Sequence, residues 1–327
     1  MLAFIGHRLI YMITTMILVS IVGFMLINLP PGSYLEVYRS ELMLQGTSTA
    51  DQQIQALEQR YALDRPVYAQ FMRWASGFLR GDFGRSFMYN REVSTLIWSR
   101  IGYTVVISGL SLLFSWLIAI PIGIYSATHK YTIWDNLFTF LSFIGLSVPG
   151  FLIALVLMVI SSRVFGWSVG GLFSREFVDA AWSWPRVVDF LQHLWIPVIV
   201  VGLAGTAGIV RMMRGNLLDI LNMQYVQTAR AKGLAENIVI YKHAVRNALH
   251  PLIMSLGMSL PQLISGATVV SIVLSLPTVG PLYFVALRSQ DMFLAGTFLI
   301  FLSFMLVVGN FLADIALAFV DPRIRFE

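Results

Sequence analysis

The sequence predicts an all-α, polytopic membrane protein with six transmembrane helices, and three observations lead to this prediction. The 327 residues have a mean hydropathy of +0.75 and only 12% of them are charged, a composition that argues against a soluble domain. Six runs lack Asp, Glu, Lys and Arg, and each can hold about 20 helical residues, the length that crosses a bilayer. Basic residues gather in a few segments between the runs. The runs are 9–35, 101–128, 136–162, 190–210, 247–287 and 292–313.

The first two segments are a retained transmembrane helix, 1–30, and an outer-face segment, 31–100. The apolar stretch after Arg8 is too long for the core of a signal peptide, and no small-x-small cleavage site follows it. Apolar residues of the outer segment recur at helical spacing in two groups, which predicts short amphipathic helices. The groups are Ile54, Leu57 and Tyr61, and then Val67, Phe71, Trp74 and Phe78.

A five-helix transmembrane core follows at 101–319, with a short tail at 320–327. Small polar side chains recur on one face of its second and fifth spans. Such a face either lines a hydrated route or bonds to a neighbouring helix, so these residues are candidates for a solute pathway, with helix packing as the alternative. On the second span they are Ser108 and Ser111, flanked by Thr104 and Ser115, and on the fifth they are Ser255, Ser259 and Gln262. Prolines at 277 and 281 predict a kink or a brief re-entrant turn after the fifth span.

The loop between the fourth and fifth spans, 211–250, is a polar and basic island with six Lys/Arg and two acids. Basic loops stay on the cytoplasmic side, and with six spans both termini share that side. Two short helices are expected here, broken at Gly233 and ended by Pro251. Tyr225, Val226 and Ala229 share one face of the first helix, which would suit a groove on a soluble partner. The alternative is a solvated loop whose charges only set the topology.

Two strings in this loop carry a resemblance to a known family. They are Thr228-Ala-Arg-Ala-Lys-Gly-Leu234 and His243-Ala-Val-Arg-Asn-Ala-Leu249, followed by Pro251. Together they closely resemble the cytoplasmic coupling loop of ABC-importer permeases and, within these, of the dipeptide/oligopeptide permease family. The likeness extends to Leu63-Asp-Arg-Pro66 and Gly81-Asp-Phe-Gly-Arg-Ser86 in the outer segment, and to Asp321-Pro-Arg-Ile-Arg325 in the tail.

The resemblance implies the permease subunit of an ATP-driven importer that works by alternating access in a bacterial or archaeal plasma (inner) membrane. The implied partners are a second homologous permease subunit, two cytoplasmic ABC ATPase subunits, an extracytoplasmic binding protein and membrane lipid. ATP and Mg²⁺ would belong to the partner subunits, with no cofactor on this chain. The implied cargo is di- or oligopeptides, with oligosaccharides or nickel as alternatives. The residues implied to couple to the ATPase are Tyr225, Val226, Thr228, Ala229, Arg230, Ala231, Lys232 and Gly233.

The sequence carries no signature of an enzyme or of a nucleic-acid-binding protein. It lacks a Walker A motif, a Gly-x-Ser-x-Gly motif and paired carboxylates within the apolar runs. The absence of Cys and the scatter of the five His residues argue against disulfides and a metal site. Ion-driven carriers usually place ionisable groups at mid-membrane, and no acid occupies the runs. From another class, the alternative is a structural or channel-like membrane protein whose basic loop binds anionic lipid.

Overall fold

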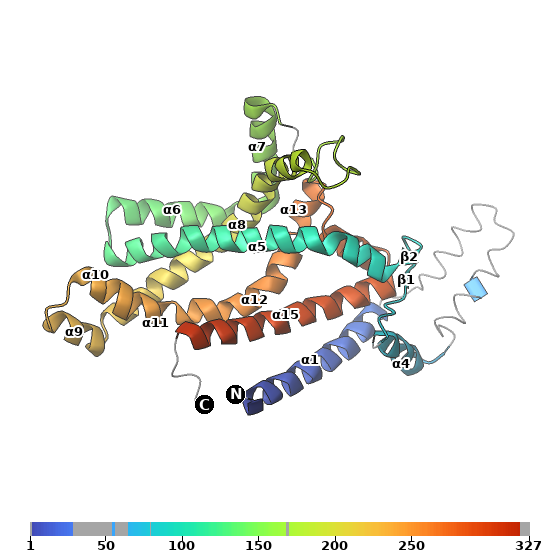
Figure 1. The fold of residues 1–327 in the computed structure, drawn as a ribbon, viewed down its shortest axis with the longest axis horizontal. Helices are drawn as coiled ribbons and strands as arrows, with labels where there is room; N and C mark the ends of the chain where they lie inside the picture. Colours follow the sequence, from blue (N-terminus) through green and yellow to red (C-terminus); the bar gives the residue numbers. More distant parts are fainter. Residues whose placement is uncertain (1, 29–53, 56–64, 79, 168–169, 321–327) are drawn as a thin grey trace. The chain divides into compact units, whose positions relative to one another are not determined.

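The computed structural model describes residues 2–28, 54–55, 65–78, 80–167 and 170–320, which are predominantly helical. Figure 1 shows their helices and strands. These residues belong to two compact units. The first unit is Met1–Gly102 with Thr278–Met305, and the second is Tyr103–Pro277 with Leu306–Glu327. Two long helices, α5 (Val93–Thr128) and α15 (Met292–Val320), have residues in both units. The prediction of an all-α membrane protein is confirmed in this coarse form.

The first unit contains α1 (Leu2–Asn28), α4 (Val67–Phe78) and α14 (Val279–Arg288), together with a small sheet. Its strands β1 (Arg85–Ser86) and β2 (Arg91–Glu92) are antiparallel. Helical periodicity did not predict this hairpin. Its turn ends at Asn90, which has a φ of 50°, a conformation that Asn tolerates better than most residues.

An aspartate connects this hairpin to the start of α15 within the first unit. Asp291 Oδ2 accepts hydrogen bonds from Ser86 Oγ at 2.5 Å and from Met88 N at 3.2 Å. Its Oδ1 accepts one from Leu294 N at 3.2 Å, which caps the first turn of the helix. Asp291 is fully buried, so these bonds satisfy a carboxylate that would otherwise be costly to bury.

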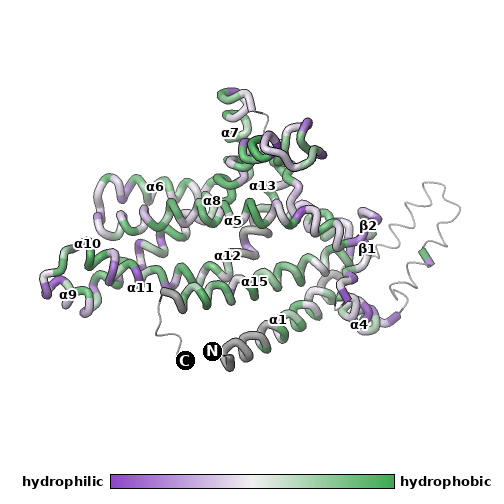
Figure 2. The backbone as a smooth tube through the Cα atoms, viewed as in Figure 1, coloured by the Kyte–Doolittle hydropathy of each residue, from purple (hydrophilic) through white to green (hydrophobic). Residues whose placement is uncertain are grey.

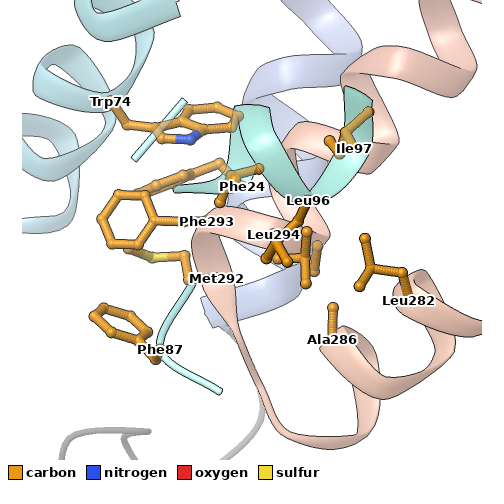
Figure 3. Packing of buried hydrophobic residues seen from close by; sticks show 12 residues of the cluster. Phe24, Trp74, Phe87, Leu96, Ile97, Leu282, Ala286, Met292, Phe293 and Leu294 are labelled. Carbon is orange, nitrogen blue, oxygen red and sulfur yellow. The ribbon is translucent and has the colours of Figure 1, made fainter. Parts of the chain in front are cut away.

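The core of the first unit is rich in aromatic side chains. Figure 3 draws Phe24, Trp74, Phe87 and Phe293 among the buried residues of this core. The Trp74 ring centroid lies 5.4 Å from that of Phe24 and 4.9 Å from that of Phe78, and Phe71 packs beside them at 5.4 Å from Phe24. The predicted amphipathic helix is therefore confirmed at α4, although Val67 at its start is exposed.

The other predicted group of the outer segment falls mostly outside the described residues. Ile54 is helical and buried, whereas Leu57 and Tyr61 lie outside the part of the chain that the structure describes.

The second unit holds the remaining helices and two short π-helical segments, η1 and η2. In chain order they are α6 (Ile133–Ser147), α7 (Gly150–Ile160), η1 (Ser161–Phe165), α8 (Trp184–Leu221), α9 (Gln224–Ala231), α10 (Glu236–Ile238), η2 (Val239–Val245), α11 (Arg246–Ala248), α12 (His250–Gly266) and α13 (Thr268–Val273). Figure 2 shows hydrophilic residues at α9 and long hydrophobic stretches on the neighbouring helices.

Helix α8 packs closely against α5 at Gly202. A Cβ atom at this position would lie 2.6 Å from Phe114 Cδ1 and 3.0 Å from the Ser111 carbonyl oxygen. Glycine therefore allows the two backbones to approach, as small residues do in membrane helix pairs.

The six predicted spans are not all present as single helices. Among the described residues, three helical segments are long and apolar enough to cross a bilayer: α5, α8 and Met292–Leu317 of α15. The third predicted run forms two helices bent by 100°, and counts as a fourth span if the pair is one broken helix. The described part of the first run lies in α1, which contributes the shorter apolar segment Ile13–Met25. The fifth run, 247–287, is divided among α11, α12, α13 and α14.

Prolines and special backbone angles explain the divisions. Pro149 forces the preceding Val148 into an extended conformation, with φ −88° and ψ 123°, which ends α6. Ser275 has a φ of 53°, and Pro277 follows it, so the fifth run stops after α13 and resumes at α14. The turn expected near Pro277 and Pro281 is thus present as a break between two short helices.

Candidate functional site

The predicted coupling segment forms a helix that ends where the sequence indicated. Helix α9 covers Gln224–Ala231, and Gly233 adopts a left-handed φ of 77°. This conformation favours glycine at the end of a helix. The break between two short helices at Gly233 is therefore confirmed.

The second helical segment of the loop ends at Ala248, shortly before Pro251 as predicted, and a new helix begins there. Pro251 lies in the first turn of α12 (His250–Gly266). Proline is tolerated there because the first turn of a helix has no intrahelical acceptor for its N–H groups.

The apolar face of α9 packs against its own chain. Val226 is fully buried and Ala229 is 7% exposed. They join a hydrophobic cluster with Met213 and Leu217 of α8 and with buried residues of η2 and α11. The sequence correctly identified an amphipathic helix, but the buried Val226 and Ala229 do not present a surface to a partner protein.

The remaining surface of α9 and the following turn are exposed, and so is Tyr225, which was predicted to share a face with Val226 and Ala229. Tyr225 is 42% exposed, and its hydroxyl oxygen accepts a hydrogen bond from Asn247 Nδ2 at 2.8 Å. The other exposed residues of the predicted coupling set are Thr228, Ala231, Lys232 and Gly233. These residues, and not Val226 and Ala229, form the exposed surface of α9 and of the turn that follows it.

An ion pair closes the turn after α9. Arg230 Nη2 lies 2.6 Å from Glu236 Oε1, and a second donor, Arg230 Nε, lies 3.1 Å from Glu236 Oε2. The hydrogen bond from Arg230 lowers the pKa of Glu236 from its ordinary value of 4.5. Both side chains are partly exposed, so the pair orients the turn and contributes little to global stability.

An ion pair between the buried Asp135 and the partly exposed Arg214, which the sequence did not predict, ties α8 to the start of α6. Arg214 Nη2 and Nε donate to Asp135 Oδ2 and Oδ1 at 3.0 and 3.2 Å, and Tyr131 N donates to Oδ2 at 3.0 Å. Thr132 Oγ1 accepts from Asp135 N at 3.2 Å. The spacing of Thr132 and Asp135 is an N-cap signal that the sequence contained, but no local pattern connects Asp135 to Arg214.

The fifth-span candidates line a cavity within the second unit. Ser255, Ser259 and Gln262 of α12 border a space of about 600 Å³, whose other walls come from α5, α7, α8 and α13. The Ser255 and Ser259 hydroxyls donate to the carbonyl oxygens of Leu252 and Leu256 at 2.7 Å. Their hydrogen-bonding capacity is thus partly used by the helix itself. Gly205 and Gly208 of α8 also border the cavity. Gly202, on the same helix, instead packs against α5.

The second-span candidates occupy a different environment. Ser108 and Ser111 are 6% and 0% exposed, and neither is among the cavity-lining residues. Ser115, one turn further along α5, does line the cavity, and its hydroxyl donates to the Gly202 carbonyl oxygen at 2.6 Å. The structure therefore separates the two polar faces. The α12 residues border open space, and Ser108 and Ser111 lie in packed surroundings.

Comparisons with known proteins cover the whole chain. The family of binding-protein-dependent transport system inner membrane components matches residues 119–326, and the N-terminal part of such membrane components matches residues 1–108. The oligopeptide transport system permease protein AppB of Bacillus subtilis is 35% identical over 330 residues, 100% of both chains. The peptidoglycan transport system permease protein YejB of Agrobacterium fabrum is 30% identical, over 99% of this chain and 98% of its own. The dipeptide transport system permease protein DppB of Alkalihalophilus pseudofirmus is 28% identical, over 100% of both.

Proposed function

The chain belongs to the family of binding-protein-dependent transport system inner membrane components, and we propose that it is the permease subunit through which an ABC importer moves peptides across a bacterial inner membrane. The full-length likeness to oligopeptide and dipeptide permeases supports this function. Family membership sets aside the alternative of an unrelated channel-like membrane protein. Oligosaccharides and nickel remain the alternative cargoes.

The proposed topology has six crossings with both termini in the cytoplasm. It counts α1 as the first crossing, the bent α6–α7 pair as the third, and α12 with α13 as the fifth. The basic residues of the 211–250 loop support a cytoplasmic location for α9. A cysteine replacing Asn237 should then be shielded from an impermeant thiol reagent in intact cells, and one replacing Ala181 should react. The reverse pattern would invert the topology.

In this proposal the exposed face of α9 docks on one of two cytoplasmic ATPase subunits, which bind ATP and Mg²⁺. The burial of Val226 and Ala229 against α8 supports a mechanical connection between α9 and this helix. Because the inner face of α9 is packed on the end of α8, a displacement of α9 by the ATPase is transmitted to that helix. A second permease subunit and an extracytoplasmic binding protein complete the transporter. ATP can shift the equilibrium between the two alternating-access states of the permease only as far as the free energy of these contacts differs between the two states.

The cavity beside α12 is the proposed part of the substrate route in this subunit. Its volume of about 600 Å³ lies within the range of small-molecule sites. Its polar groups are hydroxyls and an amide, with mostly apolar surroundings. Such groups suit a cargo of variable side chains, because they provide no fixed charge that would select one.

The central experiment separates docking from folding. Ala231→Trp adds bulk on the exposed face of α9, and Ala181→Trp adds the same bulk at an exposed position outside the loop. We expect the Ala231 variant to insert in the membrane, to lose the ATPase subunits on purification and to lose uptake of labelled peptides. The Ala181 variant should keep the ATPase subunits. Normal ATPase retention and uptake by the Ala231 variant would refute the coupling role, and uptake of an oligosaccharide or Ni²⁺ instead of peptides would refute the cargo.

A further inference from the structure

A second cavity in the second unit is lined largely by aromatic rings. It has a volume of about 630 Å³ and lies among the end of α5, the start of α6 and one residue of η2. We call it the aromatic groove. It shares no lining residue with the cavity beside α12. The residues that define it are Tyr125, Thr128, His129, Trp134, Phe138 and Tyr241.

Ring packing gives the groove a preformed wall. The Tyr125 and His129 rings stack with centroids 4.5 Å apart, and Phe138 meets Tyr125 edge-on at 5.9 Å. The Thr128 hydroxyl lies 2.9 Å from His129 Nδ1. The rest of the wall is aliphatic, including Ile124, so an apolar chain would find a complementary surface here.

The groove lies at the end of an apolar span, where the chain emerges from the bilayer. The charge-free run of α5 ends at residue 128, within the groove. On the turn that follows, Tyr131 and Ile133 are 84% and 83% exposed, and Trp134 is 57% exposed. Exposed Trp and Tyr at the end of a membrane helix are typical of the headgroup level. The aliphatic part of the groove therefore lies on the side of the acyl chains, and His129 on the side of the headgroups.

Two exposed lysines adjoin lining residues of the groove in the sequence. Lys130 and Lys242 directly follow the lining residues His129 and Tyr241, and both are exposed. The acids of α6 and α10 are already engaged, since Asp135 pairs with Arg214 and Glu236 pairs with Arg230. Among the described residues Lys130 and Lys242 form no ion pair, so both are available to a phosphate group.

We propose that the aromatic groove binds one anionic phospholipid of the cytoplasmic leaflet. An acyl chain lies along Tyr125 and Phe138, and the headgroup phosphate meets Lys130 and Lys242. Because Tyr241 belongs to η2, the lipid joins the α5–α6 turn to the loop that carries α9. The site rests on the cytoplasmic orientation of this loop in the proposed topology, and it does not require that α9 couples to an ATPase.

The test uses the purified transporter complex in vesicles of phosphatidylcholine and phosphatidylglycerol at a ratio of about 3:1. A trace of phosphatidylglycerol with a photoreactive acyl chain is crosslinked, and the labelled peptides are identified by mass spectrometry. We expect label on residues 121–138 and on η2, and much less from a photoreactive phosphatidylcholine. Trp134→Ala and Tyr241→Ala should reduce this label several-fold. Tyr131→Ala is the matched control, since Tyr131 is an exposed aromatic residue outside the lining.

Charge variants test the headgroup contact without altering the groove. Lys130→Gln and Lys242→Gln should each weaken phosphatidylglycerol labelling about fivefold and leave phosphatidylcholine labelling unchanged. Arg163→Gln, an exposed residue far along the chain in η1, should have no effect.

Three results would overturn the proposal: label outside the groove only, equal label from both lipids, or groove label that appears only after the ATPase subunits are removed. Peptide uptake is measured on the same vesicles, so a failed lipid site and a failed transport function give different results.

Discussion

Breaking the ion pair between the buried Asp135 and the partly exposed Arg214 is expected to destabilise the second unit substantially. The Asp135 side chain is 2% exposed and that of Arg214 is 31% exposed. In an Arg214→Met variant the carboxylate would lose two charge-assisted hydrogen bonds, and the bond from Tyr131 N at 3.0 Å would remain. Removing one partner of a buried pair costs about 3–5 kcal/mol, because the other charge stays buried and uncompensated. The partial exposure of Arg214 places this case near the lower limit, about 3 kcal/mol.

The assay is thermal unfolding of the purified protein, followed by the loss of its monodisperse chromatographic peak. A loss of about 3 kcal/mol corresponds to a decrease of about 6 °C in the melting temperature. Asp135→Asn with Arg214→Met removes both charges and should restore part of this loss, with a coupling energy of about 2 kcal/mol. Arg211→Met, one turn away on α8 with a cation–π contact to Phe143 at 5.9 Å, is the control and should change little. If Arg214→Met unfolds at the wild-type temperature, the pair does not hold α6 to α8 in the way described.

Three further predictions concern the cavity, the helix seam and the loop. Cysteines replacing Ser255, Ser259 or Gln262 should react with a small water-soluble thiol reagent, whereas cysteines replacing the buried Ser108 or Ser111 should be protected. The native chain has no Cys that would react as well. Protection at all five positions would mean that the α12 residues pack against a neighbouring helix and do not line a hydrated cavity. Gly202→Ala should destabilise the protein by about 1–3 kcal/mol through overpacking, because its Cβ would lie 2.6 Å from Phe114 Cδ1. Gly208→Ala, whose Cβ would have no atom within 4 Å, should be neutral or stabilising by up to about 1 kcal/mol. Equal changes in the melting temperature would contradict the close packing of α8 against α5 at Gly202. The pKa of Glu236 is lowered by Arg230. The ion pair should therefore hold the turn in place above pH 4.5, and it should be lost as the pH falls through the lowered pKa of Glu236 in the folded protein. Amide hydrogen exchange of residues 230–236 should become faster over this pH range in the wild type and not in Glu236→Gln.

Several features of the candidate site followed from local sequence. Gly233 ends α9 because a left-handed residue there favours glycine, and the flanking alanines favour helix. The polar spacing of Ser255, Ser259 and Gln262 placed them on one face of a helix, and they do border the same cavity. These are properties of a few consecutive residues, which is why the sequence was sufficient for them.

The break in the third span has a local cause, a proline, which the length of the apolar run does not reveal. The run 136–162 is apolar throughout, but Pro149 excludes helical backbone at Val148. A count of apolar residues gives the distance that a helix could cover, and it does not show where the chain bends.

The sequence by itself determined which residues share a helix face, and the tertiary structure decided what each face meets. Val226 and Ala229 share a helix face, and so do Ser108 and Ser111, because residues three positions apart lie on the same side of a helix. Whether such a face meets a partner, a cavity or a neighbouring helix depends on residues far away in the chain. Val226 is buried because Met213 and Leu217 lie opposite it. Asp135 is paired because α8 brings Arg214 beside it. No local pattern encodes these distant contacts, since each arises only when the two segments pack together.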